Sequence, residues 1–370
     1  MLVLLAGCAQ SPKLSPGACP GAPVAADARD QLNAWRQQAG LGALAISPTL
    51  ESAASAHGRY IAMHGVNSHR QTAGRAGFTG RQAGDRALAA GYPNRYVAEA
   101  LSTYTNESLP ADSGRVLDDL LAGPYHRFLL LDWTRDELGV GCHQGLQTAW
   151  VYLLGHREAR AAAPDQPALA VWPPDGAEDI PPVFFAEQPD PLPGHAVSGY
   201  PISVQFNPAR FPEPPRAVRL QLFEADTGRR LPVIVQRQKD NDPHGLLDEH
   251  QFVLFPRERL AWGESYRAEL RYGNDGQHRH VWRFRVRERQ DPVHRITEVD
   301  QIVRPEPGRP FLLQVPPVEG GDAGMSYRLV VHRSLKIEAE FVDPQVLRVT
   351  VRGQGSGEIE FQGYRVRIAL

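Results

Sequence analysis

Three polar residues, His69, Glu99 and His126, lie among apolar residues and turns, and they are the first candidates for a functional site. Glu99 stands between Ala98 and Ala100, and His126 lies between two apolar runs. A buried carboxylate or imidazole lowers stability unless it finds a partner. Two imidazoles and a carboxylate can satisfy one another around a cavity, or they can bind a metal ion. We therefore predict that the three side chains converge on one cleft.

A metal site built from His69, Glu99 and His126 would take zinc, calcium or magnesium. A zinc site uses three or four protein ligands, and a site with three leaves one position open for water. The three residues are far apart in the sequence and form no local zinc motif. A hydrogen-bonded cluster that ties loops together uses the same residue types. The sequence favours this structural cluster over a metal centre.

Two further residues are candidates for the same cleft. His57 falls on a predicted helix without the neighbouring glutamate of a metalloprotease helix, which favours a hydrogen-bonding role. Tyr125 can direct its hydroxyl at the cavity or pack its ring against other apolar groups. Ser68 lies outside any Gly-x-Ser-x-Gly motif, and no basic sequence context activates Cys142 as a nucleophile. The pattern favours binding over catalysis.

The elements that must position these residues are helices followed by strands. Apolar residues at helical spacing predict helices over 25–38, 48–64 and 80–90, and a further helix from Ser113. Ser47 and Pro48 indicate a helix start, because Ser is a good N-cap and Pro suits the first helical position. Strands are expected over 138–142 and 149–154. This mixture predicts an α/β/α sandwich.

Short sequence matches to a known family occur in order between about Ala25 and Gly155. They are Leu32-Asn33, Arg36, Gly40, Leu50, Ala53, Ala56, His57, Met63, Ser68-His69, Arg86, Ala90-Gly91-Tyr92, Glu99, Tyr125-His126-Arg127, Glu137-Leu-Gly-Val-Gly141 and Trp150-Val151. The ordered set resembles the CAP superfamily (cysteine-rich secretory proteins, antigen 5 and pathogenesis-related 1) in its bacterial secreted form. The resemblance implies the same α/β/α sandwich. It also implies binding of a small apolar ligand or sterol, as in some members, or of a cation, as in others, with proteolysis proposed for a few.

Prolines accumulate between Arg160 and Gly194, and their density excludes a regular helix or a central strand. Beyond them, short alternating strands with turns at Asp226-Thr-Gly228 and Asn274-Asp-Gly276 predict a β-sandwich. Pro173-Pro-Asp-Gly-Ala177 and Trp282-Arg-Phe-Arg-Val286 resemble parts of bacterial Ig-like repeats. The predicted organisation is α+β, with segments 1–24 (signal remnant and tether), 25–157 (CAP-like domain), 158–170 (linker), 171–290 (Ig-like sandwich), 291–310 (linker) and 311–370 (small all-β domain).

The three cysteines have two expected roles. Leu5-Ala-Gly-Cys8 resembles a bacterial lipoprotein box, so Cys8 is the predicted lipidation site at the end of a signal peptide. Cys19 and Cys142 either pair as a disulfide in an oxidising compartment or stay as separate thiols. The net charge of -2 gives no strong field to attract nucleic acid.

These observations predict a bacterial cell-envelope protein, an outer-membrane lipoprotein or a secreted protein. Its expected function is non-catalytic binding of a small ligand, a cation or a cell-envelope component in the His/Glu-lined cleft. The alternative is a metal-assisted, protease-like hydrolase that uses the same cleft. The lipid anchor would hold the protein at the membrane, and nucleic acid is not an expected partner.

Overall fold

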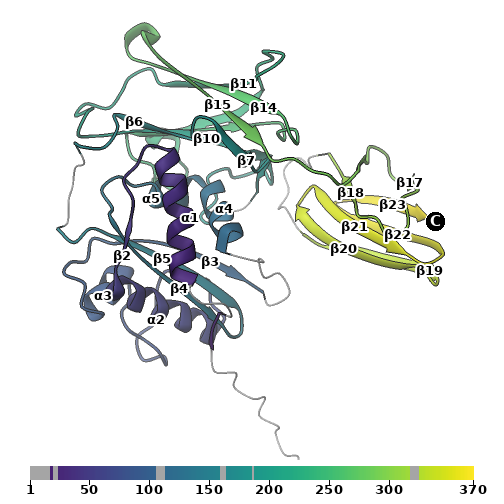
Figure 1. Cartoon of the computed structure of the whole chain (residues 1–370), viewed down its shortest axis with the longest axis horizontal. Helices are drawn as coiled ribbons and strands as arrows, with labels where there is room; N and C mark the ends of the chain where they lie inside the picture. The colour runs from purple at the N-terminus through teal and green to yellow at the C-terminus, as the bar shows by residue number, and fades with distance from the viewer. Residues whose placement is uncertain (1–16, 20–23, 106–112, 159–163, 186, 317–324) are drawn as a thin grey trace, which may run out of the picture. The chain divides into compact units, whose positions relative to one another are not determined.

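The computed structural model describes residues 17–19, 24–105, 113–158, 164–185, 187–316 and 325–370 (Figure 1). Cys8 lies outside these residues. The chain divides into two compact units, one with the described residues up to 121 and 129–166, the other with 122–128 and the described residues from 167 onward. None of the described helices is both long enough and apolar enough to cross a membrane.

The helices between residues 24 and 130 begin and end close to the predicted positions. They are α1 (Val24–Gln38), α2 (Pro48–His64), α3 (Ala83–Ala89), α4 (Ser113–Ala122) and α5 (Pro124–Leu130). Ser47 and Pro48 stand at the start of α2 as predicted. Gly65 ends α2 in the left-handed conformation at φ 60°, which glycine adopts without steric cost, and its N–H bonds to the carbonyl of Ile61. The short helix α5 was not predicted.

The sheet of the first unit has the order β1–β4–β5–β3, and β2 adds to β4 in parallel. Its strands are β1 (Gly17–Ala18), β2 (Ala45–Ile46), β3 (Ala98–Tyr104), β4 (Glu137–Gln144) and β5 (Thr148–Gly155). Helices α1 and α2 lie on opposite sides of β4, so the unit is the predicted α/β/α sandwich (Figure 1).

Two glycines allow α2 to lie directly on β4. Gly139 and Gly141 alternate with the buried Leu138 and Val140 along the strand, so both glycines point to the same face. A Cβ atom on Gly139 or Gly141 would overlap the backbone of α2. The Gly-x-Gly spacing therefore sets how closely the helix and the sheet can approach.

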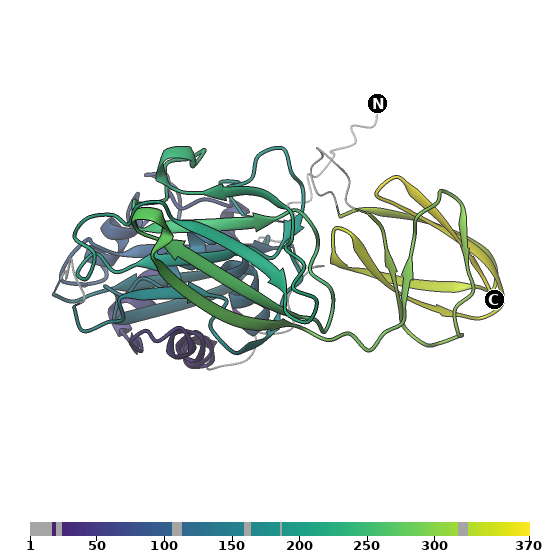
Figure 2. The same ribbon diagram turned by 90° about the horizontal axis from the view of Figure 1, so that it is seen from above.

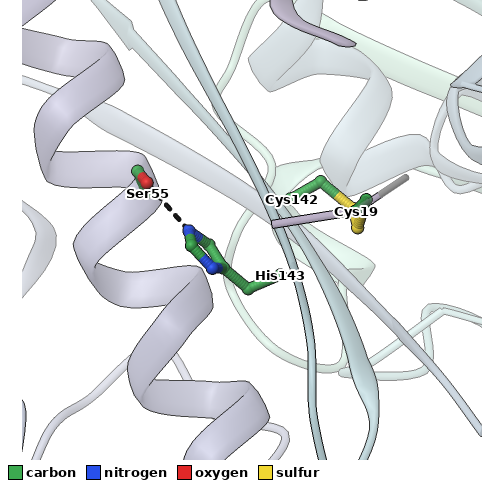
Figure 3. Close-up of a disulfide and its surroundings, with 4 residues drawn as sticks. All are labelled: Cys19, Ser55, Cys142 and His143. Atoms are coloured by element: carbon green, nitrogen blue, oxygen red, sulfur yellow. Dashed lines mark hydrogen bonds between the residues drawn. A yellow bond between two sulfur atoms is a disulfide. The ribbon is translucent and has the colours of Figure 1, made fainter. Parts of the chain in front are cut away.

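A disulfide between Cys19 and Cys142 joins the short strand β1 to β4 (Figure 3). Backbone pairing of Ala18 with His143 and a bond from the Cys19 N–H to the Cys142 carbonyl (3.2 Å) support the same connection. On the other side of β4, His143 Nε2 lies 2.8 Å from the Ser55 hydroxyl of α2. Of the two alternatives for these cysteines, the structure has the disulfide.

The second unit contains a β-sandwich between residues 167 and 290. One sheet has the order β12–β13–β10–β6, with strands β6 (Leu169–Trp172), β10 (Ile202–Phe206), β12 (Val233–Arg237) and β13 (Gln251–Pro256). The other has the order β11–β14–β15–β7, with strands β7 (Ala177–Ile180), β11 (Arg219–Glu224), β14 (Ser265–Tyr272) and β15 (His278–Val286). Strands β8 (Val183–Phe184) and β9 (Ser198–Gly199) form a small pair. The strands of the proline-rich stretch are β6, β7 and β8. β6 and β7 are edge strands and β8 belongs to a two-stranded pair, positions where a missing N–H is tolerated.

The C-terminal β-domain is also a two-sheet structure, drawn in yellow-green and yellow in Figures 1 and 2. Its first sheet has the order β16–β18–β21–β20, with strands β16 (Val293–Arg295), β18 (Phe311–Gln314), β20 (Lys336–Asp343) and β21 (Val346–Arg352). Its second sheet has the order β17–β23–β22–β19, with strands β17 (Gln301–Val303), β19 (Tyr327–Arg333), β22 (Gly355–Phe361) and β23 (Tyr364–Ala369).

The predicted linker 291–310 is wrong, because β16 and β17 lie inside it and pair in parallel with β18 and β23. Each has three residues, which is too short to show an alternating pattern in the sequence. Ile296 and Val303, from the same stretch, are part of the buried core of this domain.

Candidate functional site

The carboxylate of Glu99 is the centre of a buried polar cluster in the first unit. Glu99 lies on β3, opposite Leu153 of β5, and its side chain is only 4% exposed. The other members come from α2 (His57), the chain after α2 (His69) and α3 (Arg86). The sandwich thus brings together residues that are up to 42 positions apart, as 99 - 57 = 42. We call this set the Glu99 cluster.

Both oxygens of Glu99 accept hydrogen bonds. The Nδ1–H of His69 donates to Oε1 at 3.0 Å, and the Nη2 of Arg86 donates to Oε2 at 2.5 Å. His57 Nε2 lies 3.6 Å from Oε1, beyond a normal hydrogen bond. Burial by itself raises the pKa of Glu99, but the His69 hydrogen bond, the nearby His57 and the Arg86 charge outweigh it, so the pKa is lowered. Glu99 is therefore ionised at neutral pH.

Arg86 holds the cluster together from α3. Its side chain is fully buried, and besides Glu99 it donates through Nη1 to the carbonyl oxygens of His69, Gly80 and Arg81 at 3.1–3.4 Å. A buried guanidinium is stabilised when its charge and most of its N–H groups are matched in this way, and here the Nε–H is without a hydrogen-bond partner among the described residues. Arg86 thus fixes both the carboxylate and the backbone that carries the His69 ring.

His57 is a buried, neutral hydrogen-bonding residue. Its Nε2–H donates to the Ser68 carbonyl at 3.1 Å, and its Nδ1 accepts from the Gln71 amide at 3.1 Å. Burial lowers the pKa of His57 to about 4, against the opposing effect of Glu99 and with a further lowering by Arg86. Because both ring nitrogens have partners, His57 has none left for a ligand or a metal ion.

His69 is the member of the Glu99 cluster that reaches solvent. Its side chain is 51% exposed, while that of Glu99 is 4% exposed. Because Nδ1 is turned to Glu99, the outer ring nitrogen is Nε2, to which no described residue forms a hydrogen bond. The buried carboxylate therefore sets both the orientation and the tautomer of an accessible imidazole.

His126 and Tyr125 lie in the other compact unit, with different partners. The Nδ1–H and the backbone N–H of His126 both donate to Glu187 Oε1, at 2.7 and 2.8 Å, and the backbone N–H of Tyr125 donates to Oε2 at 3.2 Å. The Glu187 side chain is fully buried. It thereby satisfies N–H groups of the first turn of α5, which have no partner within the helix. The Tyr125 hydroxyl donates to Asp242.

Of the predicted set, His69 and Glu99 contact each other, whereas His126 contacts Glu187. Across the part of the chain that the structure describes, no group of three His, Cys, Asp or Glu side chains could hold a metal ion. Arg86 donates to one oxygen of Glu99, and Glu187 accepts the N–H of His126 Nδ1.

Sequence reasoning gave no site role to three residues that complete these clusters, namely Arg86, Gln71 and Glu187. Arg86 carried a signal, because an arginine in the alanine-rich segment 83–90 must find a counter-charge if that face is buried. Gln71 and Glu187 carried none, because both lie in irregular segments where spacing implies no direction for a side chain.

The first unit also matches a known family. Residues 29–153 match the family described as CAP, the cysteine-rich secretory protein family. Residues 29–153 are a CAP domain. Residues 122–128, which include His126, lie within the matched range but pack with the second unit.

Solved structures show similarity at low identity. An outer surface protein from Borrelia burgdorferi is 19% identical over 35% of this chain and 89% of its own, with a TM-score of 0.30. An extracellular protein with an SCP domain from Bacillus anthracis is 20% identical over 35% of this chain, with a TM-score of 0.30, and the match spans 39% of its length. CopC from Methylosinus trichosporium is 14% identical over 33% of this chain and 92% of its own, with a TM-score of 0.20. Curated proteins show no match to this chain.

Proposed function

We propose that this chain is an extracytoplasmic binding protein whose CAP domain holds a small ligand at His69 without hydrolysing it. The observation that carries the proposal is the engagement of both Glu99 oxygens by Arg86 and His69. An arginine-bound carboxylate with a lowered pKa is a poor general base. It could coordinate a metal ion only by giving up a buried ion pair, which is costly.

The chemistry that remains is that of the outer nitrogen of His69. With the proton on Nδ1, Nε2 has a lone pair and accepts a hydrogen bond from a hydroxyl or amide group of the ligand. The Glu99 contact keeps the ring in one orientation, so little conformational freedom is lost on binding. The expected ligand is therefore a small molecule with at least one hydrogen-bond donor.

A metal-assisted hydrolase is the second proposal, and the oriented imidazole of His69 is the observation that favours it. A histidine held by a carboxylate is the usual form of a general base. This function would require the ion or the nucleophile to come from outside the Glu99 cluster, because the cluster's own carboxylate is occupied.

Titration calorimetry and a casein-cleavage assay of the full chain distinguish the two proposals. Calorimetry measures the binding of zinc, calcium and magnesium ions and of three organic probes, a fatty acid, a sterol and a muropeptide. The second assay measures whether the chain hydrolyses casein. We expect one organic probe to bind and His69→Gln to weaken it roughly three- to tenfold, the effect of losing one hydrogen bond. The matched control, His64→Gln, changes a partly buried imidazole whose Nε2 bonds to the Ala76 carbonyl, and should have no effect. Zinc-dependent casein cleavage that requires His69 would overturn the non-catalytic proposal, and failure of every organic probe would overturn the ligand site.

We further propose that Cys8 anchors the mature chain to the outer membrane. The Leu5-Ala-Gly-Cys8 sequence supports lipidation, and the Cys19–Cys142 disulfide supports an oxidising compartment. One acyl chain binds a bilayer weakly, so the anchor should carry more than one. Mass spectrometry of the N-terminal peptide from the native host should show a lipid-modified Cys8, and an unmodified Cys8 would contradict the proposal.

A further inference from the structure

One face of the β-sandwich in the second unit carries an unusual excess of arginine. In the sheet of β11, β14 and β15, the register pairs Leu220 with Leu270 and Leu270 with His280, and this series of side chains points into the core. The alternate series points outward, because successive side chains of a strand lie on opposite faces. The outward residues are Arg219, Gln221, Phe223, Ser265, Arg267, Glu269, Arg271, Arg279, Val281, Arg283 and Arg285.

We call this outward surface the arginine face. On β11, β14 and β15 it has six arginines and one acidic residue, Glu269, which leaves a charge of +5 on these three strands as 6 - 1. Acidic residues at its border are Glu288, which pairs with Arg285, and the exposed Glu178 and Asp179 of the edge strand β7. The whole chain has a net charge of -2, so the face is opposite in sign to the protein as a whole. Arg219, Arg271, Arg279, Arg283 and Arg285 are all exposed.

Glu269 organises the centre of the arginine face. Its carboxylate accepts hydrogen bonds from Arg267 (3.1 Å), Arg271 (2.7 Å) and Arg279 (2.7 Å). The Arg279 hydrogen bond is the largest contribution to a pKa of about 2 for Glu269. The Arg267 guanidinium also lies over the Phe223 ring, 4.1 Å from its centroid. One carboxylate thus holds three guanidinium groups in place without neutralising them.

The remaining arginines of this face are less occupied. Arg285 pairs with Glu288 at 2.6 Å. Neither the Arg219 nor the Arg283 guanidinium forms an ion pair with a residue that the structure describes, although the Asp175 carboxylate accepts the backbone N–H of Arg283 at 2.9 Å. No ion pair within the described part of the chain therefore occupies these two side chains, and both guanidinium groups are available to a partner.

The outer faces of the C-terminal β-domain show the contrasting, balanced arrangement. There Arg328 pairs with Glu360, Arg348 with Glu340 and Arg352 with Glu338. Arg365 and Arg367 pair with carboxylates in the same way. An arginine-rich composition alone therefore does not produce an uncompensated face, since the same chain pairs its arginines on another domain.

We propose that the arginine face docks on the anionic phospholipid headgroups of a membrane surface. Guanidinium groups bind phosphate oxygens in a bidentate manner, and they lose less hydration than ammonium groups on doing so. The sheet spaces alternate side chains by about 7 Å along a strand and about 5 Å between strands. This array of cations complements a plane of phosphates. A surface for single-stranded nucleic acid would also offer aromatic rings for stacking, but the Phe223 ring is covered by Arg267.

Vesicle co-sedimentation of the full chain carrying Cys8→Ser tests the proposal, because any binding then comes from the folded surface and not from a lipid anchor. Vesicles of phosphatidylcholine with phosphatidylglycerol are compared with vesicles of phosphatidylcholine alone. We expect binding to the first kind only, and binding should weaken as salt is raised. The double variant R219Q/R283Q should lower the partition coefficient about 25-fold, from about fivefold for each arginine near an anionic surface.

The matched control is R328Q/R352Q, which makes the same change in net charge on the balanced faces and should bind almost as wild type does. Both variants are exposed surface changes that should leave the unfolding transition nearly unchanged. An equal loss in the control would show a net-charge effect and overturn the proposal. Absence of binding to phosphatidylglycerol vesicles, or binding to DNA or polyphosphate but not to vesicles, would also overturn it. Since neither His69 nor Cys8 is needed, these outcomes are independent of the proposed ligand site and anchor.

Discussion

Replacing Arg86 by Met should destabilise the CAP domain by about 3–5 kcal/mol, the usual cost of leaving one partner of a buried ion pair uncompensated. In the wild type, Glu99 is only 4% exposed and its Oε2 depends on Arg86. The change also removes the donor to three backbone carbonyls, those of His69, Gly80 and Arg81. Hydrogen exchange of β3 and β5 peptides at increasing urea concentration measures the loss in the full chain.

Two comparisons show whether the buried charge is the cause. R86M/E99L, which removes both charges, should be more stable than R86M alone, because no orphaned carboxylate remains. R95M breaks the exposed pair of Arg95 with Asp85, whose side chains are 64% and 37% exposed, and should cost less than about 1 kcal/mol. An effect of R86M no larger than that of R95M would contradict the view that Arg86 and Glu99 are the centre of the cluster.

His57 should make the CAP domain less stable as the pH falls from about 6.5 to about 4. The pKa of His57 in the folded chain is lowered to about 4, mainly by burial, while an unfolded histidine titrates near 6.5. Between these values the unfolded chain binds a proton that the folded chain does not. The contribution is fully present above pH 6.5 and is lost on acidification, by about 3 kcal/mol in total.

The difference between wild type and His57→Asn isolates this contribution. His143, also in the CAP domain, has a pKa lowered by burial, so it adds a pH dependence of the same sign to both proteins. The pKa of Glu99 is lowered as well, so its contribution is lost only below its normal range, at the acid end of the His57 window. Urea unfolding followed by hydrogen exchange at several pH values should give a flatter profile for His57→Asn. Parallel profiles would mean that His57 is not buried as a neutral imidazole.

Local sequence patterns were sufficient to predict elements whose boundaries are set by the backbone itself. Ser47-Pro48 lies at the start of α2 because both residues have a conformational preference that operates within a few residues. The hairpin of β14 and β15 follows from Asn274-Asp-Gly276, where Asp275 and Gly276 have φ values of 59° and 67°. The order of CAP-like residues likewise predicted the domain that residues 29–153 form.

The strands that were missed lack such local signals. β3 begins with Ala98-Glu99-Ala100, residues that are depleted in strands, and it exists because it pairs with β5. β16 and β17 are three-residue strands held by parallel neighbours that lie farther along the chain. Here long-range pairing overrides weak local preference.

The sequence by itself determined which polar residues would need partners, and only the tertiary structure decided which partners they have. His69 and His126 are equivalent as isolated imidazoles, yet one bonds to Glu99 and the other to Glu187. The arginine face has the same origin. The alternation of Arg279, Val281, Arg283 and Arg285 is visible along one strand, but strand register aligns it with the arginines of β11 and β14. Partner choice and surface charge depend on distances between segments that are remote in the chain, and a linear pattern holds no information about those distances until the sheets form.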